Sequence, residues 1–128
     1  MSGASGAGVI LLRIQNAAGR GPWIPGFSVQ WSDTTPAAAD LIPSFEQWPW
    51  ILKRPPRPHS GIGCRDVATL RRWFSFAEYG RLLALGFRCV QIVPDQILGE
   101  SAVQVLFRCD YPLGSFAQEV ELYPGLSR

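Results

Sequence analysis

The sequence has one histidine, His59, whose side chain is the only one with an unperturbed pKa near neutrality. It lies five residues before Cys64, and a histidine within hydrogen-bond reach of a thiol can generate a nucleophilic thiolate. That chemistry requires residues 60–63 to fold back. The alternative is a surface histidine beside a buried thiol, and the lack of an identifiable orienting group favours it.

Arg13 lies within the otherwise apolar run LLRIQ, where a buried charge would be costly unless it is paired. One interpretation is a half-exposed strand with Leu11, Arg13 and Gln15 facing water. The other is an anion-binding arginine held on a rigid strand. Late in the chain, Glu100 lies in the turn LGES, with Gln104 following. A carboxylate at a strand entrance can act in catalysis, although most such residues are solvated turn acids.

Aromatic and basic residues are combined in the stretch WPWILKRPPRPH, residues 48–59. Tryptophan and arginine are enriched at protein-interface hot spots, which predicts a partner-binding role for Trp48, Trp50, Arg54 and Arg57. The same mixture suits stacking and phosphate contacts with single-stranded nucleic acid. The third alternative is structural, with the tryptophans filling core gaps under a loop.

The three cysteines, Cys64, Cys89 and Cys109, have no zinc-site spacing, so we expect buried free thiols and no metal site. The first apolar run, residues 9–12, is far short of the roughly 20 residues needed to cross a membrane. Residues 1–8 resemble no export signal, and we expect a flexible lead. These features predict a cytoplasmic protein without membrane association.

The elements that would position these residues are short. Residues 9–15 are expected to form a strand. Residues 22–58 hold 8 of the 11 prolines and four of the five tryptophans, which predicts a long irregular segment. Its one helical candidate is residues 36–42, and residues 53–59 are expected to be extended.

The second half of the chain has clearer signals. Asp66 is expected to cap a helix over residues 67–74, and Ser75 with Glu78 forms a capping box before a helix over 76–85. Gly86 is expected to end that helix in a left-handed conformation. A short strand or turn is expected at residues 61–64. Further strands are predicted at residues 87–93 and 103–108, and less clearly at 116–123, with a turn at Pro94–Asp95.

This order predicts an α+β fold with a small, mostly antiparallel sheet, two short helices and one domain over residues 9–128. The 128 residues are 47% hydrophobic and 17% charged, which argues against a disordered chain. A net charge of +2 excludes a strongly acidic DNA mimic and is too small to imply nucleic-acid binding by bulk charge.

The stretches LLRIQNAAGRGPW, GIGCRDVATLRRWF and GFRCVQIV followed by QVLF resemble a group of small uncharacterised bacterial and phage proteins. Their order also distantly resembles the ADP-ribosyltransferase-like fold. That resemblance implies NAD as cofactor, with Arg13 holding its phosphate and Glu100 or Gln104 at the late strand. The sequence departs from it at Leu12, where an aromatic residue is usual, and at Asp66, near the expected serine or tyrosine.

Three functions follow as hypotheses. The preferred one is an accessory protein of phage or mobile-element type that binds a host protein, as a regulatory or anti-defence inhibitor, and needs no cofactor. The second is an NAD-dependent enzyme that modifies a macromolecule. The third is a single-stranded nucleic-acid binder.

Overall fold

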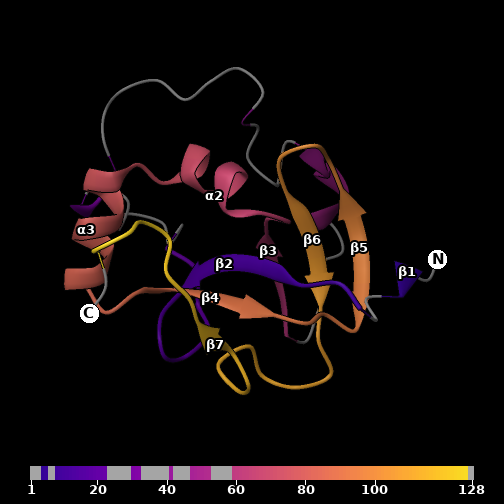
Figure 1. Cartoon of the computed structure of the whole chain (residues 1–128). Coiled ribbons are helices and arrows are strands. Elements are labelled where there is room, and N and C mark those ends of the chain that lie inside the picture. Colours follow the sequence, from indigo (N-terminus) through magenta and orange to yellow (C-terminus); the bar gives the residue numbers. More distant parts are fainter. Residues whose placement is uncertain are drawn as a thin grey trace.

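The computed structural model describes residues 4–5, 8–22, 30–32, 41, 47–52 and 59–126. In these ranges the elements are β1 (Ala4–Ser5), β2 (Leu11–Gln15), the 3-10 helix η2 (Pro49–Leu52), β3 (Ser60–Gly63), α2 (Val67–Trp73), α3 (Phe76–Ala84), β4 (Arg88–Ile92), β5 (Gln96–Glu100), β6 (Val105–Arg108) and β7 (Gln118–Glu119). Every strand pair among them is antiparallel. The predicted α+β class is therefore confirmed (Figure 1).

The strands form two sheets rather than the single sheet predicted, with the orders β1-β5-β6-β3 and β2-β4-β7. The two sheets meet where the end of β3 reaches β2. There Leu12 and Cys64 exchange two backbone hydrogen bonds of 2.7 Å. Figure 1 shows β2 and β4 crossing the middle of the molecule, with β5 and β6 to one side, α3 to the other and α2 above β2. Strand β2 is therefore central to the whole fold.

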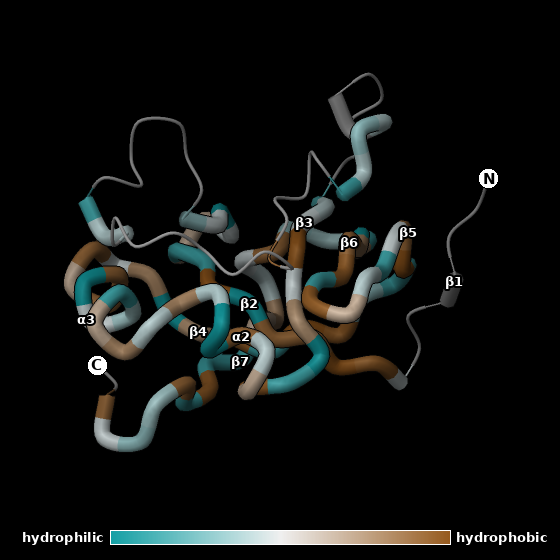
Figure 2. The backbone as a smooth tube through the Cα atoms, turned by 90° about the horizontal axis from the view of Figure 1, so that it is seen from above, coloured by the Kyte–Doolittle hydropathy of each residue, from teal (hydrophilic) through white to brown (hydrophobic). Residues whose placement is uncertain are grey.

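Side chains from β2 reach two hydrophobic clusters because successive residues of a strand point to opposite faces. Leu12 and Ile14 pack with the residues of the helices, including Leu70 and Leu82. Leu11 packs in a second cluster that is formed largely by β4, β5 and β6. All five residues of β2 are buried, so the predicted half-exposed face of Leu11, Arg13 and Gln15 is wrong. The tube in Figure 2 is brown over parts of β4, β5 and β6, with teal or pale residues between them.

The helix boundaries follow the predicted caps closely. The side chain of Asp66 accepts a hydrogen bond from the backbone N–H of Thr69 at the start of α2. Ser75 and Glu78 form both hydrogen bonds of the capping box at the start of α3. Gly86 has the left-handed φ of +94° expected at the end of α3. These local signals were sufficient because each depends on residues within one helical turn.

Other predictions are modified. Strand β5 was not predicted, and Glu100 is its last residue instead of a turn residue. The expected strand over residues 116–123 contains only β7. Within residues 1–8, which were predicted to be a flexible lead, Ala4 and Ser5 pair with β5. The flexibility of this segment stays a prediction. The helix predicted at 36–42 and the extended stretch at 53–59 lie almost entirely outside the described residues, which include only Leu41 and His59 from them.

Candidate functional site

Arg13 is a buried cation, with 6% of its surface exposed. Its Nη1 donates to the carbonyl of Ile62 and its Nη2 to the carbonyl of Gly19, both at 3.2 Å. Its guanidinium lies over the ring of Phe107, 5.8 Å from the centroid, while its buried Nε has no hydrogen-bond partner. Burial lowers the pKa of Arg13 to about 10. The side chain thus joins β2 to β3 and to the turn after β2.

Glycines leave the space that this guanidinium fills. A Cβ at Gly61 would overlap Nη1 of Arg13 and approach its Cζ to 3.0 Å, and a Cβ at Gly21 would approach Nη2 to 3.3 Å. Because the guanidinium is enclosed, with 6% of the residue exposed and both terminal nitrogens directed at backbone carbonyls, Arg13 is not placed to receive a phosphate from solvent. We therefore assign it a structural role.

Glu100 is joined to Arg65 and not to Arg13. Its two carboxylate oxygens accept from Nε and Nη2 of Arg65, the second at 2.7 Å. The side chains of Arg65 and Glu100 are 47% and 38% exposed. The hydrogen bond to Arg65 is the main cause that lowers the pKa of Glu100. Gln104 lies near this end of the sheet but is buried, at 3% exposure.

Arg65 is a residue that the sequence analysis missed. It follows the bridge at Cys64 and directly precedes the cap residue Asp66, and the chain separates it from Glu100 by 35 positions. The only signal was its place at the end of a predicted strand, which is where exposed functional side chains are often found. The structure thus gives an exposed Arg–Glu pair at the junction between β3 and α2 and the end of β5.

His59 and Cys64 are not brought together. Residues 60–63 between them form the extended strand β3 and do not fold back. Five residues of strand span about 16 Å, too far for a hydrogen bond. Cys64 donates to the carbonyl of Val103, and burial is the largest of the causes that raise its pKa to about 12. A thiol with a raised pKa is a poor nucleophile, so the Cys–His hypothesis is wrong.

The three cysteines are free and buried, as predicted. Burial is the largest cause that raises the pKa of Cys89, to about 12, and it also raises that of Cys109. Among the described residues, no three His, Cys, Asp or Glu side chains form a group that could hold a metal ion. No helix within the described ranges is long and apolar enough to cross a membrane.

The predicted partner-binding tryptophans have different environments. Trp48 is half-buried and lies over β5, because a Cβ at Gly99 would be 2.8 Å from its indole Nε1 and Cε2. Trp50, on η2, is 43% exposed. Glycine at position 99 therefore allows the indole of Trp48 to sit directly on the strand. Arg54 and Arg57 lie outside the described residues.

Trp31 and Trp73, the two other tryptophans among the described residues, make structural contacts. Trp31 is fully buried, its indole N–H donates to the carbonyl of Pro22, and its ring lies 5.4 Å from that of Phe74. Trp73 on α2 donates from its indole to the carbonyl of Val103 at 2.8 Å. The prediction that the tryptophan-rich segment fills core gaps therefore holds for Trp31. Trp50 remains as the exposed tryptophan among those the structure describes.

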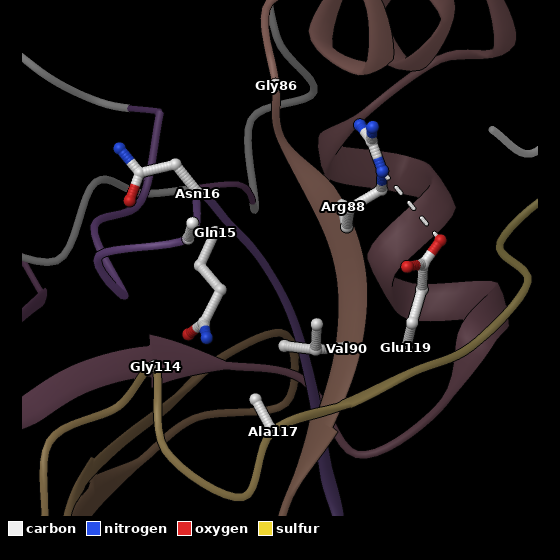
Figure 3. Close-up of a pocket in the computed structure, with 9 residues that line it drawn as sticks. Gln15, Asn16, Gly86, Arg88, Val90, Gly114, Ala117 and Glu119 are labelled. Carbon is white, nitrogen blue, oxygen red and sulfur yellow. Dashed lines mark ion pairs between the residues drawn. The ribbon is translucent and has the colours of Figure 1, made fainter.

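A pocket of about 340 Å³ lies beside the end of β2, over β4 and next to β7. Its lining residues are Gln15, Asn16, Ala17, Gly86, Arg88, Val90, Gly114, Ala117 and Glu119. Figure 3 shows Arg88 and Glu119 directed toward each other, with 3.8 Å between Nε and the carboxylate, and the amide of Gln15 away from them. Gln15 donates to the carbonyl of Leu113 at 2.7 Å. Among the described residues that line it there is no Ser, Cys, His or Lys, and its one carboxylate, Glu119, is paired with Arg88.

No protein-family model matches this chain, and comparison with curated proteins and with solved structures also finds no match. Of the side chains predicted to be functional, Trp50 on η2 and Glu100, with its partner Arg65, are exposed.

Proposed function

We propose that this chain is a small accessory protein of phage or mobile-element type that acts in the cytoplasm by binding a host protein, with Trp50 at the centre of the contact. The observation that carries the proposal is the 43% exposure of Trp50, a large aromatic side chain on a short 3-10 turn. Tryptophan is among the residues most enriched at interface hot spots, because one side chain removes a large apolar area from water.

The seating of η2 supports this role. The indole of Trp48 lies against Gly99 of β5, and so fixes the start of the turn that carries Trp50. A turn held in place before binding loses less conformational freedom when a partner covers it. Arg54 and Arg57, which follow in the sequence, extend the proposed contact with groups suited to carboxylates. Binding of this kind would inhibit or redirect the host protein by covering its surface.

The experiment compares captured host proteins for three tagged variants: the natural sequence, Trp50→Ala and Phe76→Ala. Phe76 on α3 is 58% exposed, so it provides a matched exposed aromatic away from η2. We expect one host protein that the natural sequence and Phe76→Ala retain and that Trp50→Ala loses. The same captured set for all three variants would contradict the proposal. Trp50-dependent binding to an oligonucleotide that weakens steeply with salt would instead favour the nucleic-acid hypothesis.

A second candidate function, NAD-dependent modification of a macromolecule, is supported by one specific observation. Arg65 and Glu100 are both exposed and form a two-point hydrogen-bonded pair. In this candidate Arg65, and not Arg13, would bind a dinucleotide phosphate. Glu100 would stabilise positive charge that develops on the nicotinamide ribose. Arg13 does not fit that role because it is enclosed by its backbone partners.

The test for this candidate is NAD loss in a bacterial lysate supplied with the natural sequence, Arg65→Ala, Glu100→Gln or Arg20→Ala. Arg20 is an exposed arginine and serves as the control. The candidate predicts loss that disappears with Arg65→Ala and Glu100→Gln and persists with Arg20→Ala. Absence of any loss with the natural sequence would remove the transferase and leave the binding function.

A further inference from the structure

Phe116 combines two features that are individually uncommon. Its side chain is 85% exposed, and its φ is +59°, in the left-handed region that a bulky residue rarely adopts. A backbone in this region costs free energy for a residue with a side chain, and the exposed ring of Phe116 gains no burial in the folded chain to offset that cost. Such a conformation persists only when the surrounding loop imposes it. The loop between β6 and β7, along the lower edge of the molecule in Figure 1, thus presents this ring to solvent.

A second, half-buried aromatic side chain lies beside it. The ring of Phe116 meets that of Tyr111 edge to face at 5.2 Å, and the Tyr111 hydroxyl donates to the carbonyl of Val93 at 3.1 Å. Tyr111 also packs against the second hydrophobic cluster, which contains Leu11 and Ile92. We call Tyr111 and Phe116 the Phe116 surface.

Acidic groups border the Phe116 surface. Asp110 precedes Tyr111 and has a 66% exposed side chain, and Asp95 accepts a hydrogen bond from the backbone N–H of Asp110. Burial and then the nearby charges of Cys109, Asp95 and Asp110 raise the pKa of Tyr111. Arg108 pairs with Asp110 at 2.6 Å and neutralises one of the two carboxylates. Among these groups the border therefore keeps a net negative charge.

We propose that the Phe116 surface is a second docking site, and that its occupant is a segment of a partner protein with an aromatic or aliphatic side chain flanked by Lys or Arg. The apolar side chain would pack on the rings of Phe116 and Tyr111, where a partner would bury area that is now exposed. The basic side chains would face Asp95 and Asp110, and such complementary charge selects the partner and speeds its approach. The site is independent of Trp50 and of the function proposed for it.

The test begins with a display library of random 12-residue peptides selected on the folded natural protein. Enriched peptides are labelled, and their Kd values are measured for the natural protein, Phe116→Ala, Asp110→Asn, Trp50→Ala and Phe76→Ala. Phe76 is the matched control because it is 58% exposed and also meets a tyrosine edge to face, Tyr123, at 5.5 Å. Circular dichroism confirms that each variant is folded before its Kd is compared.

We expect peptides in which an apolar residue is flanked by Lys or Arg. Their Kd should rise at least tenfold with Phe116→Ala, several-fold with Asp110→Asn, and remain within twofold for Trp50→Ala and Phe76→Ala. An empty selection, acidic peptides, or peptides that bind Phe116→Ala equally well would overturn the proposal. Phe116-dependent binding to phosphatidylcholine–phosphatidylglycerol vesicles, or Phe116-dependent self-association in sedimentation, would also overturn it, because each assigns the surface a different occupant.

Discussion

Replacing Gly61 by Ala tests the structural role of Arg13. The added Cβ would overlap Nη1 of Arg13, approach Cζ to 3.0 Å and approach Leu113 Cδ1 to 3.1 Å. The guanidinium must therefore leave its place and lose its hydrogen bonds to Ile62 and Gly19. Hydrogen bonds to a charged group contribute about 1.5–3 kcal/mol each, so losing both costs about 3–6 kcal/mol. Small domains have unfolding free energies of about 5–15 kcal/mol, so a large share of stability is removed.

The assay is urea unfolding followed by tryptophan fluorescence, since Trp31 is fully buried and reports on the core. Gly80→Ala is the control: a Cβ there meets only Leu126 Cδ2 at 4.0 Å. Because Gly80 lies in the interior of α3, Gly80→Ala should stabilise the protein by about 0.5–1 kcal/mol, whereas Gly61→Ala should destabilise it. Combining Gly61→Ala with Arg13→Met removes the overlapping group, and we expect the double variant to lose at least about 2 kcal/mol less than the sum of the single losses.

Two outcomes would refute the reasoning about Arg13. One is a Gly61→Ala protein within about 0.5 kcal/mol of the natural one, which is the range of substitutions that disturb nothing. The other is additivity of Gly61→Ala and Arg13→Met within about 0.5 kcal/mol, which would show that the two residues do not interact. Either would reopen the possibility that Arg13 leaves its carbonyl partners to bind an anion.

Three further predictions follow from particular contacts. The Phe116→Gly protein should have an unfolding free energy about 1 kcal/mol higher than that of Phe116→Ala, because φ at this position is +59°. At the helical position 76, by contrast, the Ala variant should be at least as stable as the Gly variant. Urea unfolding measures all four variants, and a Phe116→Ala protein more stable than Phe116→Gly would contradict the backbone conformation. The buried thiols of Cys64 and Cys89, whose pKa is about 12, should not react with a chromogenic disulfide at pH 8 until urea is added, and a fast native reaction would show that the core is open. Arg65→Ala should raise the pKa of Glu100 toward its ordinary value, because the lost hydrogen bond favours the charged carboxylate, and NMR titration of the carboxyl group should find a higher midpoint. Any stability from the pair is present above the pKa of Glu100 in the unfolded chain and is lost as pH falls through the lower pKa in the folded protein. An unchanged midpoint would show that the pair does not form in solution.

The parts of the fold that were predictable from sequence are those specified within a few residues. The caps at Asp66 and Ser75, the capping-box partner Glu78 and the glycine at position 86 gave both helices almost to the residue. By contrast, β5 was missed because the sequence around Gln96–Glu100 begins at a turn signal and contains Gly99. Gly99 lies at a register shift between β5 and β6 and leaves the space that the indole of Trp48 fills, a contact between distant positions.

The site was less predictable because its interactions are non-local. The burial of Arg13 depends on Gly61 and on carbonyls of two other segments, so a strand pattern in LLRIQ could not reveal it. Glu100 was recognised as a candidate, but its partner Arg65 is 35 positions away. His59 and Cys64 were close in sequence, and only the extended β3 separates them. Proximity along the chain was therefore a poor guide to which side chains meet.

The most direct test of the proposed binding function places a photo-crosslinking phenylalanine analogue at position 50, and separately at position 76, in protein expressed in host cells. Both positions are exposed, with Trp50 at 43% and Phe76 at 58%, so a crosslinker at either one can reach a partner, and the control position is the more exposed of the two. The account predicts one discrete covalent adduct with a host protein from position 50, absent from position 76 and from cells kept in the dark. No adduct at position 50, or the same adducts from both positions, would contradict the claim that Trp50 is a specific contact.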